Sequence, residues 1–275
     1  MSLTNRQIQL PDVRVPLYQL GKVSSWEISL EPVPPVIRGY FNGLMQDHDK
    51  QTPVLRRYYP NSNKPRVWMS FTPMELESHA LHIASAAGNV VVCGLGLGMY
   101  IYNILSKPEV RSVTVIEHDA DVLRLFKEVS GFETWEGSEK LTILIGDALS
   151  PNDVLKEACI NADYLYADIW EQLGSETALE DMSRICSLYK PTTAGYWGQE
   201  LDIFLSLGNL SHPAEALLDR EVANTVFSTF ADDTGIPIDS EVPNRLGYDN
   251  PYGLYVYLSV AQLVLNKREV CGYDY

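Results

Sequence analysis

The chain has 275 residues and a formal net charge of −15 at pH 7. Because a nucleic-acid backbone is bound by clustered Lys and Arg, this acidity argues against a nucleic-acid partner. At 45% hydrophobic residues the chain can bury a sizeable core, yet no apolar run reaches the ~18 residues of a membrane helix and the first residues carry no secretion signal. We therefore expect a cytoplasmic protein with no membrane partner.

Residues 1–69 form a Pro-rich segment with short alternating stretches such as VSSWEISLE and RVWMSF. Alternation of apolar and polar residues is typical of half-buried strands, so the segment predicts a small β-rich extension or lid. Its one mildly basic stretch contains Arg56, Arg57, Lys64 and Arg66. We interpret that stretch as a solvated loop.

Residues 70–200 alternate between helical and strand patterns. The pattern predicts helices over 74–87, 99–106, 120–129, 154–159 and 175–189 and strands over 90–93, 112–116, 141–145, 164–167 and 192–197. Such alternation is typical of a parallel sheet with right-handed crossovers. The fold class is therefore α/β.

The C-terminal part is less regular. Residues 214–230 predict a helix, and the aromatic run YGLYVYLSV over 252–260 predicts a strand of the core sheet. The tyrosines around 248–257 could instead serve an interface.

A glycine-rich turn follows the first strand of this region, in the segment VVVCGLGLG. Gly94, Gly96 and Gly98 allow the backbone to turn sharply and to approach a ligand without Cβ clashes. Glu117 ends the next strand, at about the 20-residue spacing at which an acid binds ribose hydroxyls. Strand, glycine turn, helix, strand and acid together indicate a nucleoside site.

Acidic residues end three successive strands of the predicted sheet: Glu117, Asp147 and Asp168. Ligands of open parallel sheets bind beyond the carboxyl ends of the strands, so these acids are expected on one rim. They would repel a pyrophosphate but suit an adenosine that carries a cationic side chain. Met99, which stands where a dinucleotide fingerprint has its third glycine, also argues against NAD.

Four segments carry a family resemblance: CGLGLG, VIEHDADVL, GDA and ADYLYADIWEQLG. In this order they resemble the motifs of class I S-adenosylmethionine-dependent methyltransferases, and the layout is most similar to spermidine synthase-like proteins. That fold adds a final antiparallel strand, for which residues 252–260 are the candidate. The resemblance thus implies a Rossmann-like, mostly parallel seven-stranded sheet with helices on both faces over 70–275, plus the β-rich extension over 1–69.

The resemblance also implies roles for individual residues. It places Asp168 and Glu171 as catalytic acids. The residues implied in binding S-adenosyl-L-methionine are Gly94, Leu95, Gly96, Gly98, Glu117, His118, Asp147, Ala148 and Asp168. Those implied in binding the acceptor are Glu75, His79, Tyr166 and Trp170. The four cysteines form no CxxC pair, so no metal site is expected.

The sequence departs from the aminopropyltransferase pattern at two informative positions. The loop is GLGLG where aminopropyltransferases usually have GGGDG, and DIW replaces their Asp-Pro pair. We predict a methyltransferase acting on a small molecule, an amine among the candidates, with a homodimer as one assembly it could form. The alternatives are a spermidine synthase-like aminopropyltransferase and a non-catalytic protein that binds an adenosine ligand.

Overall fold

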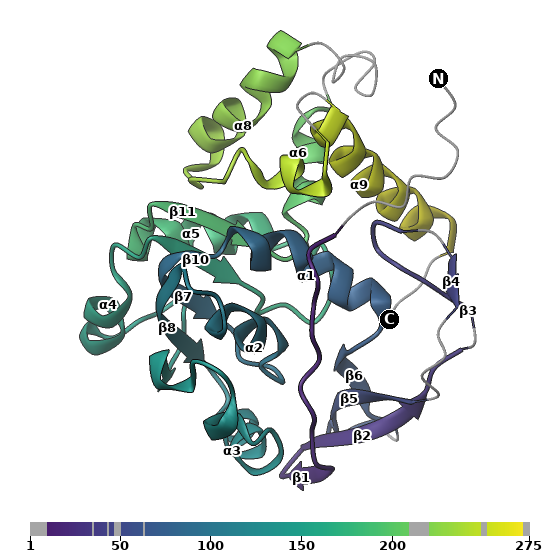
Figure 1. Cartoon of the computed structure of the whole chain (residues 1–275), viewed down its shortest axis with the longest axis vertical. Coiled ribbons are helices and arrows are strands. Elements are labelled where there is room, and N and C mark those ends of the chain that lie inside the picture. The colour runs from purple at the N-terminus through teal and green to yellow at the C-terminus, as the bar shows by residue number, and fades with distance from the viewer. Residues whose placement is uncertain are drawn as a thin grey trace.

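The computed structural model describes residues 10–34, 36–42, 44–46, 51–62, 64–208, 220–248 and 252–271. Its centre is a parallel sheet in the order β11-β10-β7-β8-β9 (Figure 1). The strands are β7 (Gly88–Cys93), β8 (Val110–Glu117), β9 (Leu141–Ile145), β10 (Tyr164–Ala167) and β11 (Thr193–Tyr196). The chain order reverses between β7 and β10, so the ligand-binding crevice of such a sheet is expected there.

Helices cover both faces of this sheet. They are α1 (Pro73–Ser85), α2 (Met99–Leu105), α3 (Ala120–Val129), α4 (Asp153–Cys159) and α5 (Ala178–Tyr189). Alternate residues of β7 point to opposite faces: Val91 and Cys93 pack in a cluster with α4 and α5, and Val90 and Val92 in one with α2 and α3. The near-continuous apolar strands of the sequence follow from this two-sided burial.

The expected helices and strands of residues 70–200 are all present, with small shifts at their ends. The range of α3 is the predicted one, and Asp119 caps the helix by accepting from Asp121 N at 2.9 Å. The helix expected over 74–87 ends at Ser85. Lys107 Nζ donates to the carbonyls of the last turn of α1, at 2.7 Å to Ile83 O, and so ends the helix without a glycine cap.

The N-terminal segment forms a separate antiparallel sheet in the order β1-β2-β5-β6. Its strands are β1 (Gly21–Val23), β2 (Trp26–Pro32), β5 (Gln51–Arg57) and β6 (Arg66–Ser70), and a second hairpin joins β3 (Val36–Arg38) to β4 (Leu44–Gln46). One face of the four-stranded sheet packs beside α3 (Figure 1). Val23, Ile28 and Leu55 are buried there in the same cluster as α2 and α3, so the two sheets share a core.

Helices gather at the other end of the molecule (Figure 1). They are α6 (Gln199–Ser206), α8 (Arg220–Thr234), the short helix η3 (Val242–Leu246) and α9 (Tyr252–Cys271). Of the helix expected over 214–230, residues 214–219 lie outside the described residues. Short 3₁₀ turns, η1 (Phe132–Thr134) and η2 (Ser138–Lys140), precede β9.

The prediction of a strand over 252–260 is wrong, because α9 occupies this range. Its buried residues include Leu254, Tyr257, Leu258 and Ala261, a spacing that places these four on one helical face. The predicted seven-stranded sheet is therefore wrong as well: the parallel sheet of the described residues has five strands. Beyond β11, Ile238 adds only a single parallel bridge, to Ala194.

Candidate functional site

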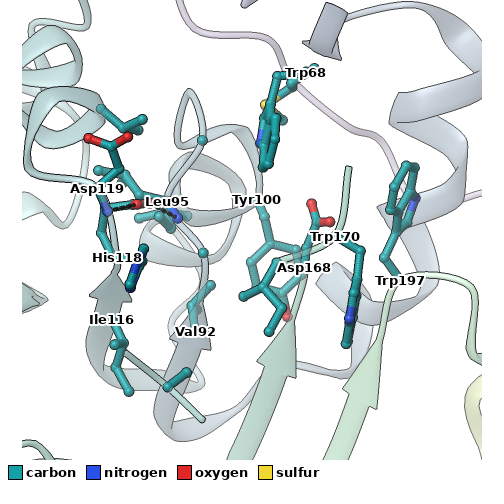
Figure 2. Close-up of a pocket in the computed structure, with 18 of the residues that line it drawn as sticks. Trp68, Val92, Leu95, Tyr100, Ile116, His118, Asp119, Asp168, Trp170 and Trp197 are labelled. Carbon is teal, nitrogen blue, oxygen red and sulfur yellow. Dashed lines mark hydrogen bonds between the residues drawn. The ribbon is translucent and has the colours of Figure 1, made fainter. Parts of the chain in front are cut away.

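A cavity of about 350 Å³ lies at the carboxyl ends of the parallel strands. Its floor is built by residues that follow β7, β8, β9 and β10, and its roof by residues of the antiparallel sheet. Figure 2 shows His118 and Asp119 on one side, Asp168, Trp170 and Trp197 on the other, and Trp68 above them. The position matches the reversal of strand order, where an open α/β sheet binds its ligand.

The glycine turn after β7 is shaped by close contacts. Gly94 has a φ of +99°, and a Cβ there would lie 2.1 Å from the carbonyl oxygen of Asp168. Only glycine fits this position, and Gly94 and Gly96 both line the cavity. Gly98 does not line it: a Cβ at Gly98 would lie 2.6 Å from the ring of Phe126, so this glycine serves helix packing.

Glu117 lies at the end of β8, next to the glycine turn. Its carboxylate accepts from Leu95 N at 3.0 Å and from Asp119 N at 2.7 Å, and the residue is only 7% exposed. Burial raises the pKa of Glu117. Each carboxylate oxygen can accept a second hydrogen bond, so Glu117 can hold the turn and still bind a ligand hydroxyl. His118 lines the cavity beside it.

Asp147 and Ala148 follow β9 and line the same cavity. Asp147 Oδ1 accepts from Leu149 N at 2.8 Å, a contact that shapes the local turn. The second oxygen of Asp147 has no such role and is available to a ligand donor, while Ala148 adds a small apolar surface that is 6% exposed.

Two carboxyl groups meet at the other end of the cavity. Asp168 follows β10 and Glu75 lies in the first turn of α1. Burial raises the pKa of Asp168 to about 7, and burial together with the nearby Asp168 raises the pKa of Glu75 to about 8. Groups with such pKa values can take up or release a proton near neutral pH.

His79 connects these acids to the core. Its Nδ1 lies 2.7 Å from the hydroxyl of Tyr166, and its Nε2 lies 3.9 Å from Oδ2 of Asp168. Burial lowers the pKa of His79 to about 3, so the imidazole is neutral at physiological pH. Burial also raises the pKa of Tyr166 well above its usual value. A protonated Tyr166 that donates to Nδ1 leaves the imidazole proton on Nε2, facing Asp168.

Trp170 and Glu171 follow Asp168 but have different surroundings. Trp170 lines the cavity, and its Nε1 donates to Asp181 at 2.9 Å. Glu171 does not line the cavity and instead pairs with Arg66 at 3.3 Å. The structure thus brings together all the predicted site residues except Gly98 and Glu171.

Several cavity residues were missed by the sequence-based prediction. Four of them belong to the antiparallel sheet: Trp26, Arg57, Trp68 and Met69. Others, such as Tyr100 and Asp119, belong to the helices and loops around the parallel sheet. Trp26 Nε1 donates to Asp119 Oδ2 at 2.8 Å, which ties the roof to the floor. The one signal in the sequence was the alternation of WEISLE and RVWMSF, which puts these aromatic residues on one face of their strands.

Trp197 follows β11 and lines the cavity at the end that holds Asp168 (Figure 2). Its ring stacks on His79 with centroids 5.9 Å apart and planes 6° apart, and its Nε1 donates to Ser78 Oγ at 2.9 Å. The stacked ring covers one face of the His79 imidazole, and the hydrogen bond to Ser78 holds the Trp197 ring in that position.

Within the described ranges, no group of three or more His, Cys, Asp and Glu side chains could hold a metal ion. Over the same ranges, none of the helices combines the length and the apolar character needed to cross a bilayer.

No family model and no curated protein matches the chain. Among solved structures it is similar to the methyltransferase domain of bacterial CtHen1-C, at 14% identity over 57% of this chain and 84% of that chain, with a TM-score of 0.38. It is also similar to the CcbJ methyltransferase from Streptomyces caelestis (15% identity, 42% and 48% covered, TM-score 0.31) and to the glycopeptide N-methyltransferase MtfA complexed with sinefungin (16%, 38% and 39%, 0.28). The chain spans under half of the last two. Likenesses this weak leave the function to be argued from the site itself.

Proposed function

We propose that the chain is an S-adenosylmethionine-dependent methyltransferase that acts on a small molecule. One observation carries the proposal: a single cavity joins the glycine turn, Glu117, Asp147 and Asp168 at the ends of successive parallel strands. These side chains are acceptors, and the ligand contains the matching donors in its ribose hydroxyls, adenine amino group and amino-acid ammonium group.

The residues present fit such a ligand. Gly94 and Gly96 line the cavity without side chains, so the backbone of the turn can approach the ligand closely. Glu117 would bind the ribose hydroxyls, and Asp147 with Ala148 would hold the adenine. When bound, S-adenosylmethionine supplies a methyl group on a positively charged sulfur, which is open to in-line attack. The acceptor end of the cavity, near Glu75, His79 and Asp168, is left for the attacking molecule.

The chain's own residues can orient and deprotonate the acceptor. Asp168, with a pKa of about 7, would take the proton of the attacking group or hold that group in line. A general base of this kind contributes ~10²–10⁴-fold to a rate. The tryptophan rings around the site, such as Trp170 and Trp197, would exclude water and face the positive charge of the sulfonium, worth about 0.5–2 kcal/mol.

The size of the cavity supports a small acceptor. Its volume of about 350 Å³ lies at the lower end of the range of small-molecule sites, roughly 300–1,000 Å³. The roof of Trp26, Trp68 and Met69 closes it toward the antiparallel sheet. A polymer would need an open groove instead.

A second candidate, aminopropyl transfer to an amine, is favoured by the pair Glu75 and Asp168. Two carboxyl groups at one end of a cavity suit a cationic amine, whose positive charge would favour their ionised forms. The two activities differ in their cofactor, because aminopropyl transfer uses the decarboxylated form.

The test is a transfer assay with S-adenosylmethionine labelled in its methyl group, offered with pools of small amines, phenols and carboxylic acids. Methyl transfer is supported if the label appears on an acceptor with the wild-type protein and does not appear with Asp168→Asn. Transfer of a label placed in the propyl chain of the decarboxylated form, with no methyl transfer from S-adenosylmethionine, would support the second candidate instead; methylthioadenosine is then the leaving group. Tight binding of the cofactor with no transfer in any pool would favour the non-catalytic alternative.

A further inference from the structure

Arg57 is the one guanidinium among the described residues that line the cavity, and its surroundings are otherwise acidic. Five carboxyl side chains line the same cavity: Glu75, Glu117, Asp119, Asp147 and Asp168. Arg57 ends β5 on the antiparallel sheet, where its register partners are Trp26 on β2 and Arg66 on β6. It therefore enters the cavity from the roof, opposite the acids of the floor.

The neighbouring arginines are paired, and Arg57 is not. Arg56 pairs with Glu31 at 2.8 Å, and Arg66 pairs with Glu171 at 3.3 Å. Within the part of the chain that the structure describes, no carboxylate forms an ion pair with Arg57. A half-buried guanidinium without a counter-ion keeps its hydrogen-bond donors for another partner.

Aromatic rings hold this guanidinium in place without neutralising it. Its central carbon lies 4.9 Å from the ring centre of Trp26, 5.2 Å from Tyr59 and 5.8 Å from Trp68. Contacts of this kind attract the cation and offer no oxygen or nitrogen acceptor to its N–H donors. The rings also restrict its rotamers, so little freedom is lost when a ligand binds.

A carboxylate is the group that best matches this site. The guanidinium edge binds a carboxylate through two parallel hydrogen bonds. A phosphate would bring up to two negative charges into a cavity that five carboxyl groups already line, whereas a carboxylate brings one. We infer that Arg57 binds the carboxylate of a small molecule in this cavity.

The inference rests on the proposed function and deepens it. The carboxylate has two possible sources, the amino-acid end of the cofactor or the acceptor. In the first case Arg57 selects the carboxylated cofactor, and therefore methyl over aminopropyl transfer. In the second case the acceptor is an organic acid, held at the roof while its nucleophile faces Asp168.

Calorimetric titrations of the wild-type protein and of Arg57→Gln test the inference. Three probes are used. S-adenosylhomocysteine has the carboxylate, and methylthioadenosine lacks the amino-acid group. Benzoate is added both to the free protein and to the protein loaded with methylthioadenosine. Arg66→Gln is the matched control, because Arg66 contacts the same Tyr59 ring at 5.1 Å and does not line the cavity. Arg57→Lys keeps the charge and serves if the glutamine variant does not fold.

If the cofactor supplies the carboxylate, Arg57→Gln weakens the binding of S-adenosylhomocysteine by roughly 10- to 100-fold and leaves the affinity for methylthioadenosine unchanged. If the acceptor supplies it, both adenosine ligands bind as before, and Arg57→Gln loses the benzoate binding of the loaded wild type. In either case Arg66→Gln behaves as wild type and Arg57→Lys shows a smaller loss.

Two results would overturn the inference. In the first, folded Arg57→Gln binds all three probes as tightly as the wild type does. In the second, the wild type does not bind benzoate with or without methylthioadenosine, and Arg57→Gln binds S-adenosylhomocysteine as tightly as the wild type. Failure of the proposed function looks different: the wild type then binds no adenosine ligand. The benzoate titration of free protein still decides the role of Arg57 in that event.

Discussion

The two sheets of this molecule contribute opposite chemistry to one cavity. The parallel sheet supplies acids, each at the end of a strand, and the antiparallel sheet supplies aromatic rings and one cation. Strand ends of a parallel sheet meet at one edge, so a single residue after each strand is enough to build a polar floor. The roof is made by side chains from β2, β5 and β6, three strands of a sheet that packs on α3. In the proposed function the floor binds hydroxyl and amino groups of the ligand, while the roof excludes water and contributes the cation of Arg57.

Loss of the acid at the reacting end should have the largest effect. Asp168→Asn is expected to lower turnover by ~10²–10⁴-fold, because the amide cannot take the acceptor's proton, and to weaken cofactor binding by a smaller factor. In the wild type, turnover should rise with pH through about 7, as Asp168 ionises. Initial rates across pH measure both effects.

Glu171→Gln is the control for that experiment, since Glu171 is paired with Arg66 outside the cavity. It should keep the wild-type rate. Equal rates and equal pH profiles for Asp168→Asn and the wild type would remove Asp168 from the mechanism.

The next largest effect is expected at the middle of the floor. Glu117→Gln should weaken the binding of S-adenosylhomocysteine by roughly 10- to 100-fold, because the charged acceptor of the ligand hydroxyls is lost. The hydrogen bond from Leu95 N is weakened as well. Calorimetry measures the change, with Asp121→Asn on α3 as the control. An unchanged affinity in Glu117→Gln would show that this part of the floor does not bind the ligand.

A smaller effect is expected from the roof. Trp68→Ala removes one ring above the cavity and should weaken the binding of S-adenosylmethionine by roughly two- to thirtyfold. The loss should be smaller for S-adenosylhomocysteine, whose sulfur carries no charge. Tyr58→Ala, an exposed aromatic residue of the same sheet, should leave both affinities unchanged. If Trp68→Ala costs more than Glu117→Gln, the division of roles between the sheets is wrong.

The smallest effect concerns stability. Burial raises the pKa of Glu75 from the usual 4.5 to about 8, so its protonated form contributes stability that is present below the unfolded pKa and lost as pH rises through about 8. Glu75→Gln cannot ionise and should be more stable than the wild type by on the order of 1 kcal/mol at alkaline pH. Thermal unfolding between about pH 5 and about pH 9 tests this. A stability difference that does not grow with pH would show that Glu75 does not ionise in this range.

The residues of the cavity floor could be predicted from the sequence because each of them is identified by its immediate neighbours in the chain. Each acid stands directly after an apolar run, and the glycines stand directly after another, so the positions of Glu117, Asp147 and Asp168 at one rim follow from the strand pattern. Gly98 and Glu171 lie only a few residues from true cavity residues, yet their side chains face Phe126 and Arg66. A motif specifies the backbone path better than it specifies which side chain turns inward.

The roof and the C-terminal helix could not be predicted in the same way. Arg57 and Trp68 reach the cavity only because the antiparallel sheet docks on α3, a long-range contact with no local signature. In residues 252–260, aromatic and β-branched residues resemble a strand. The burial of Leu254, Tyr257, Leu258 and Ala261 instead follows a helical period set by packing against α6 and η3.

The most direct test of the central claim is a calorimetric titration of the wild-type protein with S-adenosylhomocysteine, methylthioadenosine and NAD. Binding of the two adenosine thioethers at one shared site, with no binding of NAD, is the expected result, because the acids of the floor accept from hydroxyl and amino groups and repel a pyrophosphate. A folded protein that binds neither thioether, or that prefers NAD, would contradict the assignment of this cavity to an adenosyl cofactor.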